Sequence, residues 1–202
     1  MAQPTNSLEW IVYLAENYSN MFIQGTLLTL YISILGTILG FILGYVSGII
    51  QDIQIRPADN PVKKLLLRII KIIFTVYVEL FRGTPMIVQA MIVYYGILQA
   101  GLHISAVAAG ILVTVLNTGA YMAETVRAGI NSVDIGQREG ALAMGMSPMK
   151  TMLYVILPQV LRNILPEMGN TFLTNLKMTS VLNVIAVNEL FMAAKTVGAI
   201  YY

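Results

Sequence analysis

The sequence predicts an all-α protein that crosses a membrane several times. Of its 202 residues, 57% are hydrophobic and only 11% are charged, whereas an ordinary soluble domain has roughly 25% charged residues. Two long stretches, 17–51 and 83–123, contain no charged residue. Because a bilayer core needs about 20 apolar residues per helix, the first stretch holds one span and the second most of two. The mean hydropathy of +0.74 agrees.

The composition excludes several classes of function. The chain has no cysteine and a single histidine, His103, so it offers no disulfide framework and no cysteine or histidine metal site. A phosphate-binding loop of the form G-x4-G-K-[ST] is absent from the sequence, so no ATPase activity of its own is predicted. The net charge of +2 is too small to indicate nucleic-acid binding. We therefore expect no cofactor and no catalytic site.

The first element expected is a short interfacial helix over 7–20, followed by a first span over 21–50. The aromatic residues suited to the headgroup region are Trp10, Tyr13 and Tyr18. No Lys or Arg precedes the first apolar stretch, so the N-terminus does not resemble a signal peptide. Prolines and asparagines in 51–61 predict a turn-rich loop.

A polar stripe with helical spacing follows the loop. Its members are Lys64, Arg68, Lys71, Thr75, Glu79 and Arg82. Pro85 should end this helix, because proline lacks a donor and clashes with the preceding turn, and apolar helices are expected over 86–100 and 104–126. One helix over 62–100 would be about 57 Å long, well beyond a core of ~30 Å. Either its basic end projects from the membrane, or the break redirects the chain.

A polar segment then predicts two short helices joined by a tight turn. Asp134 can cap a helix of about ten residues, with Gln137 three positions later as in a capping box. Gly145 fits the left-handed position that ends helices, and Ser147-Pro148 suits the start of the next one. The expected product is a compact knob within a loop at about 128–151. Its Leu and Met side chains would either bind a partner's groove or pack under the bundle itself.

The last part of the chain predicts one interrupted span and one polar segment. Residues 152–178 form a span that contains Pro158 and Pro166. Residues 179–196 are apolar but poorly suited to lipid, because they hold Asn183, Asn188, Glu189 and Lys195.

Cations are distributed unevenly, which predicts an orientation. Residues 1–20 and 99–104 contain no Lys or Arg. Nine cations lie in the two regions that flank the central spans, namely Arg56, Lys63, Lys64, Arg68, Lys71, Arg127, Arg138, Lys150 and Arg162. Because Lys and Arg accumulate in cytoplasmic loops, we expect the N-terminus outside and the knob in the cytoplasm.

Three groups of polar residues lie at predicted membrane depth, where ionisable side chains usually face the bundle interior. Glu79 and Arg82 are three positions apart and are expected to pair. The other groups are Asn117, Tyr121 and Glu124, and then Glu167, Asn170, Thr171, Thr174 and Lys177. Each group alone is equally typical of contacts between helices. Three together predict a polar path.

The knob carries a longer pattern, E-G-A-L-A-M-G over 139–145 followed by Leu157-Pro158. It resembles the cytoplasmic loop of binding-protein-dependent ABC importer permeases, E-A-A-x3-G-x9-I-x-L-P. Val155 stands at the isoleucine, and Gly140 replaces the first alanine. The matching residues are Glu139, Ala141, Gly145, Leu157 and Pro158.

Four further segments resemble the polar amino acid permeases of the glutamine/histidine/arginine type. They are Glu79–Pro85 (E-x2-R-G-T-P), Asn117–Ile130, Leu165–Asn170 (L-P-x2-G-N) and Lys177–Ser180 (K-x-[ST]-S). The resemblance extends from about residue 20 to 200.

This resemblance implies a transmembrane domain over 21–202, after an external or interfacial segment at 1–20, with five spans in a bacterial inner membrane. It implies a homodimer or heterodimer of permeases, two ATPase subunits that bind ATP, and an external substrate-binding protein. One further span would follow 179–196, so the sequence looks short at its C-terminus. The ATPase contacts would be Glu139, Gly140, Ala141, Leu142, Gly145, Leu157 and Pro158.

A solute in such a path can be predicted from its charges. An amino acid needs donors for its carboxylate and acceptors for its ammonium. Arg82 and Thr84 offer donors, and the acceptors are Asn117, Glu167 and Asn170. With Thr171 neutral and Arg82 beside Glu79, a polar uncharged amino acid such as glutamine is expected. The rivals are a secondary transporter, which would show an inverted repeat and midplane carboxylates, and a membrane enzyme. The sequence shows neither pattern.

Overall fold

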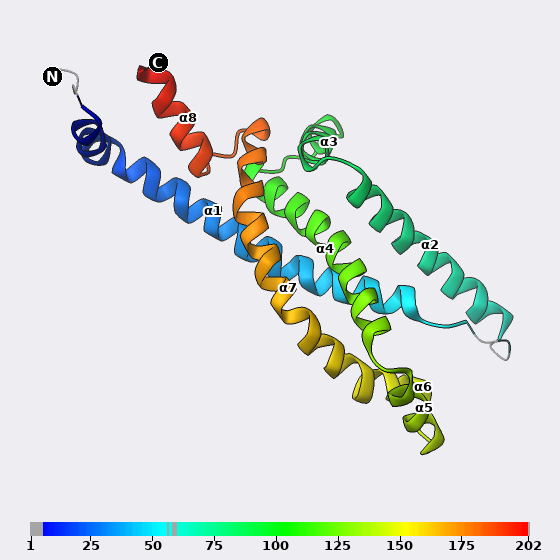
Figure 1. The fold of residues 1–202 in the computed structure, drawn as a ribbon. Coiled ribbons are helices and arrows are strands. Elements are labelled where there is room, and N and C mark those ends of the chain that lie inside the picture. The colour runs from blue at the N-terminus through cyan, green and yellow to red at the C-terminus, as the bar shows by residue number, and fades with distance from the viewer. Residues whose placement is uncertain (1–5, 56, 58–59, 202) are drawn as a thin grey trace.

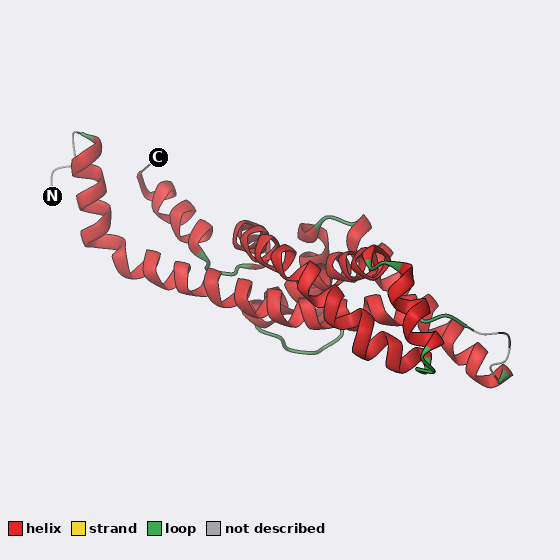
Figure 2. Cartoon of the chain, turned by 60° about the horizontal axis from the view of Figure 1, so that its bottom comes forward, coloured by secondary structure: helices red, strands yellow, loops and turns green. Residues whose placement is uncertain are grey.

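The computed structural model of the chain describes residues 6–55, 57 and 60–201, so Arg56 of the expected loop lies outside them. The described residues form helices joined by short loops, and none of them lies in a strand (Figure 2). The predicted all-α class is confirmed. In chain order the elements are α1 (Ser7–Asp52), α2 (Pro61–Gly83), α3 (Met86–Gln99), α4 (Ala106–Ser132), α5 (Ile135–Ala143), α6 (Pro148–Thr151), the π-helix η1 (Met152–Ile156), α7 (Leu157–Met178), the 3-10 helix η2 (Thr179–Ile185) and α8 (Leu190–Tyr201).

Helix α1 is continuous over 46 residues, where the sequence predicted an interfacial helix and a separate span. Asn6 caps it, because its side chain accepts from the Glu9 N–H at 2.9 Å and donates to the Glu9 carboxylate at 3.0 Å. No proline occurs between Ser7 and Asp52 to interrupt the backbone ladder. Instead of a break, the helix shows a bend near its N-terminal end (Figure 2).

Helix α4 lies against α1 along a seam of small residues (Figure 1). A methyl group added at Gly44 would stand 2.4 Å from Met122 Cβ and 2.7 Å from the Gly119 carbonyl oxygen. Residues four apart share one helix face, so the glycines allow the backbones to approach closely, as small residues do in membrane helices. The residues that face each other are Gly36, Gly40, Gly44 and Gly48 on α1, and Thr114, Thr118, Met122 and Val126 on α4.

Asn175 of α7 joins both helices of this seam. Its buried amide donates to the Thr37 hydroxyl of α1 at 2.9 Å and to the Thr118 hydroxyl of α4 at 3.1 Å. A buried amide without partners would be costly. These bonds therefore favour one register of α7 against the α1–α4 pair.

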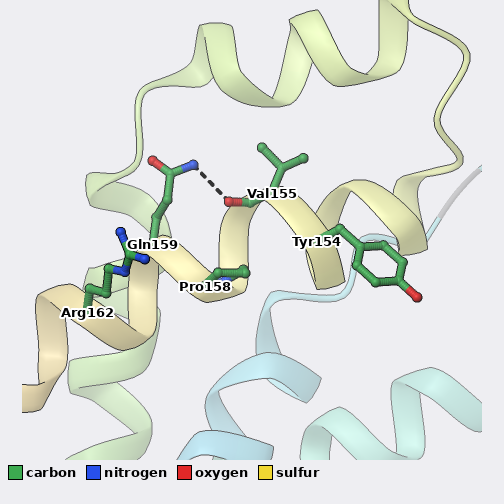
Figure 3. Close-up of a pocket in the computed structure, with 5 residues that line it drawn as sticks. All are labelled: Tyr154, Val155, Pro158, Gln159 and Arg162. Atoms are coloured by element: carbon green, nitrogen blue, oxygen red, sulfur yellow. Dashed lines mark hydrogen bonds between the residues drawn. The ribbon is translucent and has the colours of Figure 1, made fainter.

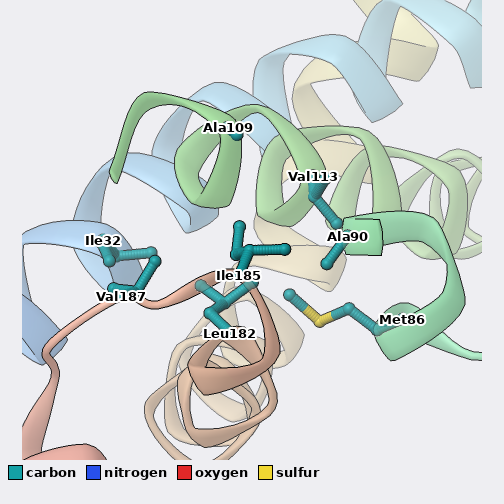
Figure 4. Packing of buried hydrophobic residues seen from close by; sticks show 8 residues of the cluster. All are labelled: Ile32, Met86, Ala90, Ala109, Val113, Leu182, Ile185 and Val187. Carbon is teal, nitrogen blue, oxygen red and sulfur yellow. The ribbon is translucent and has the colours of Figure 1, made fainter. Parts of the chain in front are cut away.

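Two apolar clusters complete the core, and neither contains a residue of α2. The first joins α1, α3, α4 and η2 with the segment before α8 (Figure 4), through Ile32, Met86, Ala90, Ala109, Val113, Leu182, Ile185 and Val187. The second joins α4 to η1 and α7 through Val126, Ile130, Ile156, Val160 and Ile164. Helix α2 therefore packs at the side of the bundle.

The predicted span over 152–178 is helical but distorted at its start. The Leu157 N–H bonds to the carbonyl of Met152, five residues back, and Pro158 has no N–H to offer. The Gln159 side chain donates to the Val155 carbonyl, four residues back, at 2.8 Å. Such π-turns are rare and often occur at functional sites.

Within the described residues, α1 and α4 are each long and apolar enough to cross a membrane, and the stretch 148–185 with α8, bent by 58°, would add a third span. The resemblance implied five. Helix α3 is short, and α2 carries six charged side chains. Large apolar side chains cover the outer faces, with Ile42 55% and Ile72 62% exposed. Exposed large apolar side chains in this number mark a surface that contacts other proteins or a membrane, in agreement with the predicted polytopic membrane protein.

Candidate coupling knob and polar path

The predicted knob is formed by α5 and α6. Asp134 is the N-cap of α5, and its carboxylate accepts from the Gly136 N–H at 2.7 Å. Gln137 contributes only its backbone N–H, which bonds to the Asp134 carbonyl at 3.0 Å. The cap was therefore predicted correctly, while the reciprocal side-chain bond of a capping box is not formed among the described residues.

The turn after α5 has the geometry that its glycine predicts. Gly145 has φ +84°, its N–H bonds to the Leu142 carbonyl at 3.0 Å, and the Met146 N–H bonds to the Ala141 carbonyl at 3.1 Å. These two bonds define a Schellman motif. Ser147 then caps α6, with Pro148 as its first residue.

The knob exposes apolar side chains and is joined to the end of α1 by an ion pair. Met144 is 80% and Ile135 71% exposed, whereas Ala141 is buried. The Arg138 guanidinium lies 3.3 Å from the carboxylate of Asp52, at the end of α1. The exposure does not fit the alternative in which these side chains pack under the bundle. Glu139, Gly140, Leu142 and Gly145 are all exposed.

Leu157 and Pro158, the end of the loop pattern, lie on α7 and not on the knob. Leu157 is 7% exposed, and its carbonyl accepts from the Tyr45 hydroxyl at 3.4 Å. Pro158 lines an open pocket of about 260 Å³ (Figure 3). These two residues therefore belong to the start of α7, where the Tyr45 hydroxyl of α1 bonds to the backbone. The other lining residues are Tyr154, Val155, Gln159 and Arg162.

The first two predicted polar groups meet between α2 and α4, but with different partners. Arg82 lies 3.5 Å from the Glu124 carboxylate and not against Glu79, so the predicted Glu79–Arg82 pair is wrong. Glu124 also holds Arg127 at 3.1 Å, and the Arg82 guanidinium stands 5.9 Å from the ring centre of Tyr121. The acidic partner of Arg82 is thus Glu124 on the neighbouring helix α4 and not Glu79 on its own helix α2.

Gln89 of α3, which the sequence analysis missed, joins this region to the break between α2 and α3. It is 5% exposed, and its Nε2 lies 2.9 Å from both the carbonyl and the hydroxyl oxygen of Thr84. Its Oε1 accepts from Asn117 Nδ2 at 3.1 Å. Its signal was an amide inside an apolar helix of 14 residues, whose other amide, Gln99, is the last residue of that helix.

The third predicted group stays apart from the other two. Glu167 and Asn170 are exposed on α7 and bond to each other at 3.2 Å, and Thr171 is half-buried. Among the described residues, no hydrogen bond or ion pair joins this face to Arg82 or Asn117. Within one chain the structure therefore brings two of the three groups together.

Comparisons with known proteins show what this chain is similar to. A family model described as binding-protein-dependent transport system inner membrane component matches residues 64–200. The arginine transport system permease protein ArtQ of Bacillus subtilis is 39% identical over 127 residues, which cover 62% of this chain and 58% of ArtQ. The glutamine transport system permease protein GlnP of Escherichia coli K12 is 42% identical over 117 residues, 57% of this chain and 53% of GlnP. The chain thus spans little more than half the length of these relatives.

Solved structures agree with the fold. One described as a crystal structure of an amino acid ABC transporter with histidines matches with a TM-score of 0.82 and 33% identity, over 99% of this chain and 86% of that one. An inward-facing MetNI methionine ABC transporter matches in fold, with a TM-score of 0.73 and 22% identity, over 93% of this chain and 84% of that one. The chain belongs to the family of binding-protein-dependent transport system inner membrane components.

Proposed function

We propose that this chain is the transmembrane permease subunit of an ATP-driven, binding-protein-dependent amino acid importer. The observation that carries the proposal is the capped knob of α5 and α6, which presents Met144 and Ile135 to a partner. A slim helix with an apolar face suits a groove on an ATPase subunit. The ATPase binds and hydrolyses ATP, and the permease itself is not catalytic. Transport then follows from a shift between two shapes of the bundle.

A second permease subunit and an external binding protein complete the proposed machine. The face of α7 that carries Glu167 and Asn170 supports the second subunit. Ionisable groups at membrane depth do not face lipid, and this face is exposed in the isolated chain. A second copy or a sibling permease would cover it, so that the α7 face and the Arg82 region line one path between two subunits.

The proposed solute is a polar amino acid such as glutamine. Two arginines share Glu124, which leaves one positive charge for the solute carboxylate. Asn117, Glu167 and Asn170 offer acceptors to its ammonium, and Thr84 and Thr171 are neutral. Uptake of labelled glutamine into proteoliposomes, in competition with a panel of amino acids, tests this. Absence of saturable glutamine uptake, or stronger competition by arginine or lysine than by unlabelled glutamine, would contradict it.

The docking proposal is tested by reversing one charge on the knob. Glu139→Lys should abolish uptake and release the co-expressed ATPase from the purified complex, with insertion into the membrane unchanged. Glu16→Lys, an equally exposed change on α1 far from the knob, should retain the ATPase. Copurification of an ATPase also separates this function from a secondary transporter. Normal ATPase retention by Glu139→Lys would refute the docking site.

The proposed orientation has the N-terminus outside and the knob in the cytoplasm, in a bacterial inner membrane. The cysteine-free chain allows single-cysteine labelling, and Ser7 and Ser132 are both exposed. In intact cells, an impermeant maleimide should label Ser7→Cys and not Ser132→Cys. The opposite pattern would overturn the orientation.

A further inference from the structure

The break between α2 and α3 leaves backbone carbonyls that side chains satisfy in place of helical N–H groups. Pro85 has no N–H, so the carbonyl of Phe81, four residues earlier, loses its usual donor. The Gln89 amide lies 2.8 Å from that oxygen. The Thr84 hydroxyl donates to the Leu80 carbonyl at 2.7 Å and is itself 2.9 Å from Gln89 Nε2. Two side chains thus replace the helical bonds that the proline prevents.

The same amide fixes the orientation of Asn117 on α4. Gln89 Nε2 is used by the break, so its Oε1 points to α4 and accepts from Asn117 Nδ2 at 3.1 Å. Asn117 Nδ2 also lies 3.4 Å from the Phe81 carbonyl. With its donor nitrogen held in this way, Asn117 presents its Oδ1 as an acceptor, and that oxygen has no hydrogen-bond partner among the described residues.

Arg82 lies in the last turn of α2, two residues before Thr84, and its guanidinium reaches across to α4. It faces Glu124 and Tyr121 on the same helix that carries Asn117. A donor for a carboxylate and an acceptor for an ammonium therefore both lie at this junction, and the buried Gln89 amide bonds directly to the residue that carries the acceptor. An apolar residue of equal volume would fill the site but satisfy none of these groups.

We propose that Gln89 is a positioning residue of the solute path, which fixes the α2–α3 break and orients Asn117 as the acceptor for the solute ammonium. This inference rests on the proposed function for its solute, but its structural half does not. Hydrogen-bond networks that are fully satisfied fix one arrangement, and their removal releases several. Loss of the amide should therefore widen the distribution of α2–α3 angles.

Two spin labels on the cysteine-free chain measure the break directly. The labels are attached at Ile73→Cys on α2 and Ile92→Cys on α3, where the parent side chains are 59% and 68% exposed and belong to none of the three polar groups. In the assembled complex without ATP, Gln89→Met should broaden the distance distribution between them, and so should Gln89→Glu, which keeps the length but loses the donors. Gln99→Met, an exposed amide on the same helix, should leave the distribution unchanged. An unchanged distribution in both Gln89 variants would overturn the proposal.

A kinetic measurement separates positioning from general destabilisation. For solute-stimulated ATP hydrolysis, Gln89→Met should raise the glutamine concentration for half-maximal stimulation roughly tenfold, with a smaller change in maximal rate. An equal loss in both parameters, or the same shift in Gln99→Met, would overturn the role in the path. If the parent complex transports no amino acid and none stimulates its ATP hydrolysis, the proposed function fails. The spin-label distances still decide whether Gln89 fixes the break.

Discussion

The α1–α4 seam and the region between α2, α3 and α4 use opposite means to hold helices together. In the seam, glycines at every fourth position bring backbones so close that a single methyl group would collide. In the other region, α2 has one buried residue, Val78, and is attached to α4 through polar contacts of Tyr77, Phe81 and Arg82. Both regions share helix α4, which therefore has one rigid side and one adjustable side.

The difference shows which contacts can change during transport. Closely packed backbones have no alternative arrangement of similar energy, so α1 and α4 should move as one body. Half-exposed ion pairs contribute little to stability and can exchange partners. The polar side of α4 is thus the side where a solute can compete.

The largest effect is expected from breaking the seam. Gly44→Leu places a branched side chain where even Cβ would be 2.4 Å from Met122 Cβ, and overpacking of this kind should cost at least about 3 kcal/mol. We expect loss of the folded protein, measured by thermal unfolding in detergent. Gly96→Leu is the control, since nothing lies within 4 Å of a Cβ there. Equal stability of the two variants would refute the seam.

An intermediate effect is expected from a pair of asparagines on α7. Asn175→Leu removes the bonds to Thr37 and Thr118 and should destabilise the chain by about 1–3 kcal/mol. Asn170→Leu, on the exposed face of the same helix, should leave the unfolding temperature of the isolated chain nearly unchanged but reduce uptake. If Asn170→Leu were the more destabilising change, the proposed assignment of the two faces would be wrong.

The smallest change in stability is expected in the polar region. Glu124→Gln removes the partner of Arg82 and Arg127, which are 35% and 43% exposed at their side chains, so the cost should stay below about 1 kcal/mol. Uptake should nevertheless fall roughly tenfold, because two unpaired cations would bind the solute carboxylate too strongly to release it. Glu79→Gln should have little effect on either quantity. If uptake fell in Glu79→Gln and not in Glu124→Gln, the pair formed by Glu79 and Arg82 would be the functional one.

Local features of the fold could be predicted from the sequence, and contacts between distant segments could not. Asp134, Gly145 and Ser147 were assigned correctly because capping depends on a few neighbouring residues. The Glu79–Arg82 pair was wrong because spacing on one helix says nothing about Glu124 on another. Gln89 could not be found, since its partners come from three elements.

The glycine seam is a different case, because its signal was present. Gly36, Gly40, Gly44 and Gly48 form three successive G-x3-G patterns in an uncharged stretch, a pattern typical of close helix pairs in membranes. The pattern alone names one helix of the pair and not its partner. Only the structure identifies α4 as the other helix.

Helix α1, which has no break, connects the knob mechanically to α8. Asp52, at one end, pairs with Arg138 of the knob, and the Tyr18 hydroxyl, near the other end, bonds to that of Tyr201 of α8 at 2.9 Å. At 1.5 Å per residue the stretch from Tyr18 to Asp52 is about 51 Å long. A sideways displacement of about 3 Å at the knob tilts this stretch by only about 3–4°. In the proposed assembly, a small movement of a docked ATPase would therefore reach the opposite end of α1 as a tilt, without α1 having to bend further or unfold.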